Sequence, residues 1–223
     1  MPSDTGDTGA SETMLAWKFL ERGRLAPFGG HVWPAPGTGA PGPWVHPPGG
    51  EVFACRISDL PWWINVELWE VELKAPIRTR STQVVGTRGR LLRRMVGWDD
   101  VALRAYGVAC AEHARDLAVS LFLREGRTAD ADALRQTRSP LELCRVAQGL
   151  ATDAATPATT MAGYVGASAF RAAEGAAAAA ARHAADAAMA ADGTPGVLER
   201  EIEWQARWIA ERAGLGVPMA AAL

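Results

Sequence analysis

The sequence is poor in the residues that most often reveal a function. Its 223 residues include only three cysteines, four histidines and two lysines. The cysteines, Cys55, Cys110 and Cys144, are odd in number and lack C-x-x-C spacing, which argues against a disulfide framework or a thiolate metal site. We therefore expect three buried, reduced thiols.

Long hydrophobic runs and targeting signals are also missing. No stretch reaches the roughly 18 apolar residues that a membrane-spanning helix needs, and the acidic opening MPSDTGDTGA is unlike a secretory signal. A net charge of -2 gives no overall attraction to nucleic acid or to anionic lipid. These absences predict a cytoplasmic protein with no nucleic-acid partner and no membrane partner.

Three common motifs that carry a known chemical mechanism are absent too. The sequence has no P-loop, no G-x-S-x-G and no H-E-x-x-H pattern. We therefore expect no cofactor and no metal, and the sequence leaves open whether the protein is an enzyme.

The composition of the chain changes near Trp98. Seven of the nine tryptophans and most of the prolines lie at or before that residue, whereas alanine dominates the remainder. The pattern predicts an α+β protein, with a small antiparallel β-rich part (residues 14–98) packed on an Ala-rich helical bundle (residues 99–215). Residues 1–13 are expected to be a flexible N-terminus and residues 216–223 a C-terminal tail. Trp98 should lie near the junction of the two parts.

The β-rich part is expected to contain several short strands. Alternation predicts a strand over residues 15–20, and further strands are expected over residues 51–56 and 66–73. A short helical turn capped by Ser58 should separate the last two, and turn chemistry at residues 86–89 predicts a hairpin. Residues 34–50 are too rich in proline and glycine for a sheet interior, so they should form a long exposed loop that behaves as a stiff flap.

The second part has clear helix signals. Apolar residues at three- and four-residue steps predict a helix from Asp99 to about residue 123, and a short helix is expected over residues 129–137. Ser139, followed by proline and by a glutamate for a capping box, should open another helix. Thr156 should open a long helix to about residue 191, and a last helix should end near Gly214.

The tryptophans fall into two groups. Packing is the expected main role of Trp17, Trp69 and Trp98, because an indole buries a large apolar area. The other group could bind a ligand or clamp the loop, and because two of its members are adjacent in sequence, one of that pair should be core and the other ligand-facing. The binding candidates are Trp33, Trp44, Trp62 and Trp63.

The histidines are weak catalytic candidates. His31 and His46 flank the Pro/Gly loop and are the first choices for acid–base work. His113 is a third candidate, and helix packing could bring it close to His183. For these two, an ordinary core or boundary histidine is the favoured interpretation over a metal ligand.

Arginines without acidic neighbours mark residues 75–94. On a hairpin, Arg78, Arg80, Arg88 and Arg90 would share a face and could bind an anion. The favoured alternative is that these arginines pair with Glu67, Glu70 and Glu72 on a neighbouring strand.

The helical part resembles bacterial immunity proteins. The resemblance covers residues 99–209 and is carried by the segments DDVALRAYGVACAEHARDLA, AFRAAEGAAAAAARHAADAAMA and LEREIEWQARWI. It implies a binding protein that neutralises a toxin or engages another protein or peptide partner, and it implies no catalytic residue. The alternative is a cofactor-independent enzyme of bacterial specialised metabolism, with a Trp-lined pocket for a small apolar substrate. A homodimer is left open.

Overall fold

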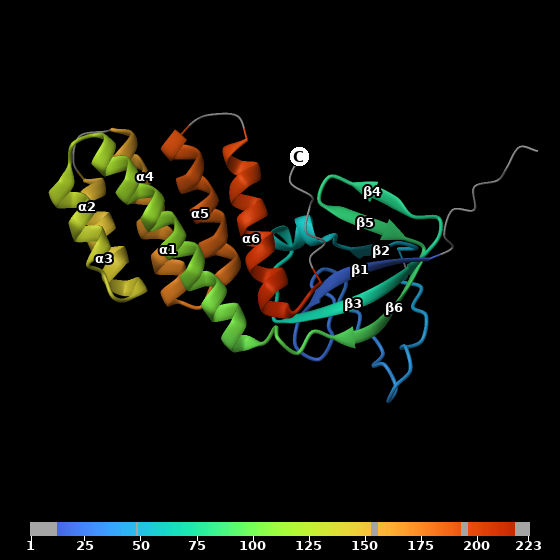
Figure 1. Cartoon of the computed structure of the whole chain (residues 1–223). Helices are drawn as coiled ribbons and strands as arrows, with labels where there is room; N and C mark the ends of the chain where they lie inside the picture. Colours follow the sequence, from blue (N-terminus) through green and yellow to red (C-terminus); the bar gives the residue numbers. More distant parts are fainter. Residues whose placement is uncertain (1–12, 48, 153–155, 193–195, 217–223) are drawn as a thin grey trace, which may run out of the picture.

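The computed structural model describes residues 13–47, 49–152, 156–192 and 196–216. Of the described residues, 51% are in helices and 20% in strands, and all described strands precede the first α-helix. The α+β prediction is therefore confirmed, and Figure 1 shows the strands on one side of the molecule and the helices on the other. Among the described helices, none combines the length and the apolar character that crossing a membrane requires.

The described strands form two antiparallel sheets. In the first sheet, β3 (Glu67–Lys74) lies between β1 (Thr13–Leu20) and β6 (Arg88–Arg94). In the second, β5 (Gln83–Gly86) lies between β2 (Val52–Ala54) and β4 (Arg78–Arg80). Thr13 begins β1, so it does not belong to the expected flexible N-terminus; residues 1–12, like residues 217–223 of the expected tail, lie outside the described residues.

The two sheets are joined at both sides. On one side, Trp17 of β1 and Cys55 exchange backbone hydrogen bonds of 2.9 and 2.6 Å. On the other, the chain passes from β5 to β6 through the single residue Thr87. The hairpin predicted at residues 86–89 is therefore wrong, because β5 pairs with β4 and β2 while β6 pairs with β3. The hairpin turn lies instead at residues 81–82, between β4 and β5.

Close packing explains the glycine at position 89 of the predicted turn. A Cβ on Gly89 would lie 2.8 Å from the side chain of Val52 and 3.2 Å from the Trp33 ring. The first of these distances is shorter than real Cβ atoms tolerate. Glycine at this position therefore lets β6 approach the core between the sheets, and it is not a turn residue.

Both faces of the first sheet are covered. Phe19 and Leu68 belong to a large cluster shared with the helices, which we call the helical core. Ala16 and Leu20 point the other way, into a smaller cluster that we call the sheet core. The sheet core consists of Ala16, Leu20, Trp33, Val45, Val52, Ala54, Trp69, Val71, Leu73, Val84 and Leu91. Because the helical core includes residues of β1 and β3, the two parts of the chain are packed as one body.

Six α-helices follow the strands in the described part of the chain. Asp99 caps the first, accepting a hydrogen bond of 2.8 Å from the Ala102 amide, and Ser139 and Thr156 cap the third and fourth as predicted. The last ends at Gly214, which has the left-handed conformation of a helix C-terminus. The helices are α1 (Asp100–Arg124), α2 (Thr128–Arg135), α3 (Pro140–Ala151), α4 (Pro157–Ala173), α5 (Ala177–Asp192) and α6 (Val197–Ala213).

The long helix predicted over residues 156–191 is wrong, because it is two helices. Gly175 has a φ of 76°, a conformation that ends a helix and that alanine on either side would resist. The chain turns there, and α4 and α5 pack against each other. The alanine-rich composition correctly predicted a helix on each side of Gly175, but it did not predict the break at this one glycine.

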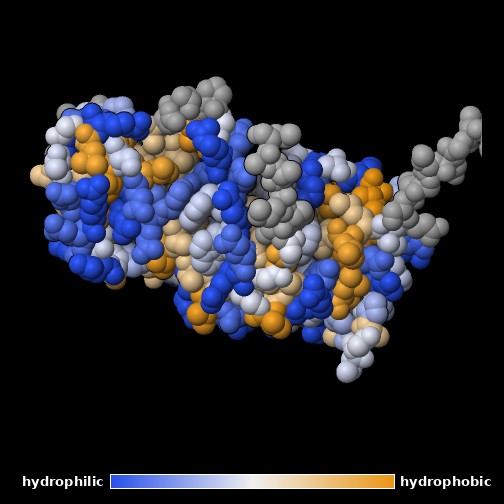
Figure 2. Space-filling view, viewed as in Figure 1, coloured by the Kyte–Doolittle hydropathy of each residue, from blue (hydrophilic) through white to orange (hydrophobic). Residues whose placement is uncertain are grey.

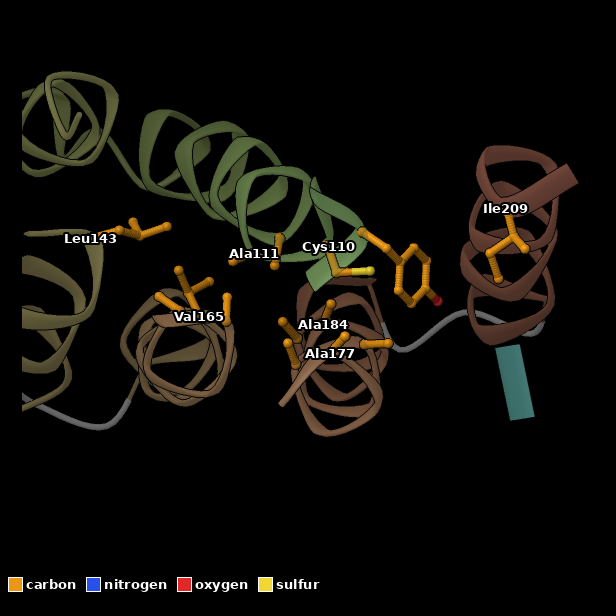
Figure 3. Close-up of a cluster of buried hydrophobic side chains, with 14 of the residues drawn as sticks. Cys110, Ala111, Leu143, Val165, Ala177, Ala184 and Ile209 are labelled. Carbon is orange, nitrogen blue, oxygen red and sulfur yellow. The ribbon is translucent and has the colours of Figure 1, made fainter. Parts of the chain in front are cut away.

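Small side chains let the helices approach closely. Figure 3 shows Cys110 and Ala111 of α1 near α4 and α5, the helices that carry Val165 and Ala177. A Cβ on Gly107 would lie only 3.1 Å from the Ala177 Cα, so α1 and α5 are nearly in backbone contact at this level.

Trp98 lies at the junction of the two parts, as predicted. It is fully buried, with its ring centroid 5.6 Å from that of Phe19 in β1 and 6.0 Å from that of Tyr106 in α1. Its indole donates a hydrogen bond of 2.9 Å to the Asn65 carbonyl. Figure 1 shows α6 between α5 and the strands, where it also contacts the 3-10 helix η1 (Ile57–Trp62).

Candidate functional site

A pocket of about 780 Å³ opens at the end of the β-rich part. Five segments distant in sequence meet there: β1, the turn after it, the end of the Pro/Gly loop with β2, the end of η1, and the β4–β5 hairpin. The residues that line it are Lys18, Phe19, Ala26, Pro27, Phe28, Gly29, His31, Trp33, Pro47, Gly49, Glu51, Val52, Phe53, Ala54, Cys55, Trp62, Trp63, Ile64, Asn65, Arg80 and Gln83. Pockets of this size and composition are typical of small-molecule sites.

Aromatic rings form the walls of the pocket. Trp33 is 3% exposed and belongs to the sheet core, so its ring is a fixed wall. Trp63 is held by a hydrogen bond of 2.7 Å from its indole to the Thr82 carbonyl, and the Phe28 ring meets it edge-on at 6.1 Å. At the rim, Trp62 is 49% exposed and Phe28 87% exposed. In Figure 2 hydrophobic residues form an orange patch over the β-rich part, whereas the outer surface of the helices is mainly hydrophilic.

Trp62 and Trp63 both line the pocket, and their burial differs as the sequence predicted, because Trp63 packs against the helical core and Trp62 is 49% exposed. Adjacent side chains alternate sides in a strand, but in a 3-10 helix they are only about 120° apart. The two tryptophans end such a helix, which runs over Ile57–Trp62. Arg56 precedes this helix as its cap, and the predicted cap Ser58 lies inside it.

Lys18 is the main polar group of the pocket. Its Nζ donates a hydrogen bond of 2.6 Å to the Phe53 carbonyl and lies 5.3 Å from the centroid of the Trp33 ring. Removal from water disfavours an ammonium, and burial lowers the pKa of Lys18 from 10.5 to about 8.

His31 is a second polar group in the pocket. Its Nε2 is buried and has no hydrogen-bond partner among the described residues. Its ring lies edge-on to Trp33, with the centroids 6.2 Å apart. A buried ring nitrogen without a partner is uncommon in folded proteins, and here it belongs to a group that lines an open cavity.

Cys55 lines the same pocket but is not a nucleophile at neutral pH. Burial raises the pKa of its thiol to about 12, and the thiolate is the reactive form. All three cysteines are free and buried, as the sequence predicted. Within the described ranges, no group of three or more His, Cys, Asp or Glu side chains is placed to hold a metal ion.

Trp44 and His46 lie away from this pocket. The Trp44 ring stacks on the Arg90 guanidinium at 4.6 Å, and His46 Nδ1 lies 3.0 Å from the Thr87 carbonyl oxygen. Between them, Val45 exchanges backbone hydrogen bonds with Gly89 of β6. The loop over residues 34–50, with Pro48 outside the described residues, is therefore pinned to the edge of β6 at this point and is not a free flap there.

His113 belongs to a separate polar network inside the helical part. Its Nε2 lies 3.1 Å from a Glu201 carboxylate oxygen, and its ring stacks on Trp204 at 4.0 Å. Gln205 donates hydrogen bonds to Glu201 and to the Ala181 carbonyl, and it accepts one of 2.9 Å from the Tyr106 hydroxyl. These contacts connect α1, α5 and α6. His183 instead lies 3.5 Å from Asp186 on its own helix.

The four arginines of the weak anion site do not share a face. Arg78 and Arg80 of β4 both pair with Glu51, whereas Arg90 of β6 pairs with Glu72 at 2.6 Å. Arg88 is exposed at the start of β6. The strand-to-strand pairing that the sequence favoured is therefore present for Arg90 and for Arg93, which pairs with Glu70.

Glu67 departs from that pattern. Its carboxylate accepts hydrogen bonds of 3.0 Å from the Trp69 indole and from the Gly23 amide. These bonds hold the turn after β1 against β3, so the carboxylate serves the turn rather than an arginine of β6.

Lys18, Phe28 and Phe53 were missed as site residues by sequence reasoning. The signal that could have found Lys18 is its position between Ala16 and Leu20, which share its face of β1 and are buried. Packing was the expected role of Trp17, which lies on the opposite face of the strand. Both faces are covered, so a lysine on either face would be drawn inward.

Comparisons with known protein families, with curated proteins and with solved structures give no match for this chain.

Proposed function

We propose that this protein binds a small, flat, largely apolar molecule in the pocket between Trp33, Trp62 and Trp63. The observation that carries the proposal is the pocket itself, a cavity of about 780 Å³ walled by aromatic rings. Small-molecule sites usually combine such apolar walls with a few polar groups that fix orientation. Lys18 and His31 supply these groups here.

The rim of the pocket supports the same proposal. Phe28 and Trp62 are large apolar side chains that stay substantially in contact with water. Contiguous exposed apolar surface on a protein usually marks a binding site. A flat ligand would cover these rings and remove their exposed apolar surface from water, which favours binding.

Two tryptophans of similar exposure give a matched test. Trp62 is 49% exposed and lines the pocket, whereas Trp44 is 37% exposed and lies outside it. Naphthalene-2-methanol is a suitable probe, and its affinity can be measured by isothermal titration calorimetry or ligand-observed NMR. We expect Trp62→Ala to weaken binding by about fivefold or more, as the loss of one ring contact predicts, and Trp44→Ala to leave it unchanged. No binding at about 1 mM probe, or equal loss in both variants, would refute the proposal.

A protein or peptide partner is the second candidate function. The exposed rim supports it, because an apolar side chain of a partner could enter the pocket between Phe28 and Trp62. Such a partner would use the same walls as a small ligand. It would therefore compete with naphthalene-2-methanol, and Trp62→Ala would weaken its binding more than Trp44→Ala.

A further inference from the structure

Lys18 has an unusual place in the fold. It lies in β1 on the same face as Ala16 and Leu20, both of which are buried in the sheet core. Its side chain therefore extends into the space between the two sheets and ends in the pocket. The only other lysine of the sequence, Lys74, is exposed at the end of β3.

No acidic side chain of the pocket pairs with the Lys18 ammonium. Besides Lys18, the pocket is lined by the ionisable side chains of His31, Glu51, Cys55 and Arg80. Glu51 is the only carboxylate among them, and it is engaged by Arg78 and Arg80. Within the described part of the chain, no ion pair joins the Lys18 ammonium to an acid, and its hydrogen-bond acceptor is the Phe53 carbonyl.

An amine in this position can react. At pH 7 only about one in three thousand ordinary lysines is uncharged, but burial lowers the pKa of Lys18 to about 8. A neutral amine that donates one N–H to the Phe53 carbonyl still has a free lone pair. Lysines desolvated in apolar pockets are the usual amines that condense with carbonyl compounds.

We propose that Lys18 forms a reversible imine with an aldehyde or ketone bound in the aromatic pocket. This inference rests on the proposed function and names its ligand class: a flat apolar molecule with an accessible carbonyl group. The Lys18 side chain would provide the covalent contact, and Trp33, Trp62 and Trp63 would hold the apolar part.

The chemistry of the step is balanced without an oxidant or a reductant. The Nζ lone pair attacks the carbonyl carbon, a C–N bond forms, and the oxygen takes up one proton to give a carbinolamine. The C–O bond then breaks, Nζ loses its second proton, and a C=N bond and one water molecule result. The proton that Nζ loses goes to the departing oxygen, and the imidazole of His31, which lines the same pocket, would carry it.

The two lysines allow an internal comparison in one molecule. The full-length chain is incubated near pH 7.5 with 2-naphthaldehyde and cyanoborohydride, which reduces an imine to a stable amine, and the adducts are located by peptide mapping. We expect Lys18 to be labelled at least about tenfold faster than Lys74, because a bound reactant has a high effective concentration. Naphthalene-2-methanol, which cannot form an imine, should slow labelling of Lys18 and leave that of Lys74 unchanged.

Variants complete the test. Lys74→Met should keep the fast adduct, and Lys18→Met should lose it while Lys74 is still labelled at its wild-type rate. Labelling of Lys18 no faster than that of Lys74 would overturn the inference. If the alcohol nevertheless binds with the expected dependence on Trp62, the imine fails and the proposed ligand binding stands. If 2-naphthoate binds more tightly than the alcohol and no adduct forms, Lys18 serves as a cation for carboxylates, and the inference is again overturned.

Discussion

Replacing Lys18 with methionine should change how the stability of the protein depends on pH. The substitution keeps an unbranched side chain of similar length and removes the charge from the pocket. In the folded protein the pKa of Lys18 is lowered from 10.5 to about 8 by burial. Between these two values the unfolded chain binds more protons than the folded chain, so this lysine makes the protein more stable as the pH rises.

The size of the effect follows from the pKa shift. One pKa unit corresponds to about 1.4 kcal/mol, so the shift sets an upper bound of roughly 3 kcal/mol on the unfavourable free energy of the buried charge at pH 7. Because the pocket is open to solvent, we expect about 1–2 kcal/mol. The methionine side chain has no such penalty, so the variant should be the more stable protein at pH 7. It should lose much of this advantage by pH 10 and the rest above pH 10.5, where the unfolded lysine also loses its proton.

Urea unfolding of both proteins at several pH values between 7 and 10 measures this difference. The comparison matters because burial also raises the pKa of the Cys55 thiol to about 12, which lowers stability as the pH rises in wild type and variant alike. The quantity to follow is therefore the gap between the two free energies of unfolding. A gap that stays constant from pH 7 to 10 would show that Lys18 is well solvated, and the reasoning about the pocket amine would be wrong.

The helical part gives further predictions. Tyr106→Phe removes the hydrogen bond to buried Gln205 and should lower the free energy of unfolding by about 1–3 kcal/mol; an unchanged urea midpoint would contradict it. Gly107→Ala should destabilise by a similar amount, about 1–3 kcal/mol, because the new Cβ would lie 3.1 Å from the Ala177 Cα. Gly149→Ala is the control: no atom lies within 4 Å of its added Cβ, so thermal denaturation should show equal or higher stability, by up to about 1 kcal/mol. If both alanines act alike, close packing of α1 on α5 is not what requires Gly107.

Sequence patterns predicted the helical part well because its signals are local. Asp99, Ser139 and Thr156 each begin a helix where capping chemistry requires it, and the left-handed Gly214 ends the last one. The one error there, the missed break at Gly175, concerns a glycine inside a strongly helical composition. Helix propensity is summed over many residues, so a single left-handed residue has little weight in it.

The pairing of the strands was harder to predict because it is not local. Turn chemistry at residues 86–89 indicated a hairpin, but β5 and β6 belong to different sheets. The small side-chain volume of Gly89 is required by Val52 and Trp33, which are more than 30 residues away in sequence. A residue that serves a distant contact looks the same in the sequence as one that serves a turn.

Only part of the candidate site was predicted, because it too is built from residues distant in sequence. Trp33, Trp62, Trp63 and His31 were singled out, and all four line the pocket. Trp44 and His46 were grouped with them because they are near in sequence, but the pairing of Val45 with Gly89 directs that segment toward β6. Lys18 was missed because a lysine in a strand is normally assigned to the exposed face.

The shape of the pocket depends on a polar clamp between η1 and the β4–β5 hairpin. Asp59, only 4% exposed, accepts hydrogen bonds of 2.6 and 2.9 Å from Arg56, and the same guanidinium donates to the Ser81 carbonyl at 3.0 Å. The neighbouring Thr82 carbonyl accepts the Trp63 indole. Both carbonyls belong to the turn of the hairpin, so one turn fixes the position of η1 and of the indole that ends it.

The helices support the same wall from behind. Leu60 of η1 is fully buried in the helical core, and α6 packs directly on η1. The polar clamp and this apolar contact both hold η1, whereas Trp62 at its end extends to the rim, where it is half exposed. A binding wall that is rigid at its base and exposed at its edge loses little conformational entropy when a ligand covers it. The packing of the helical bundle on the β-rich part is therefore what prepares the pocket, although none of the described α-helices contributes a residue to its lining.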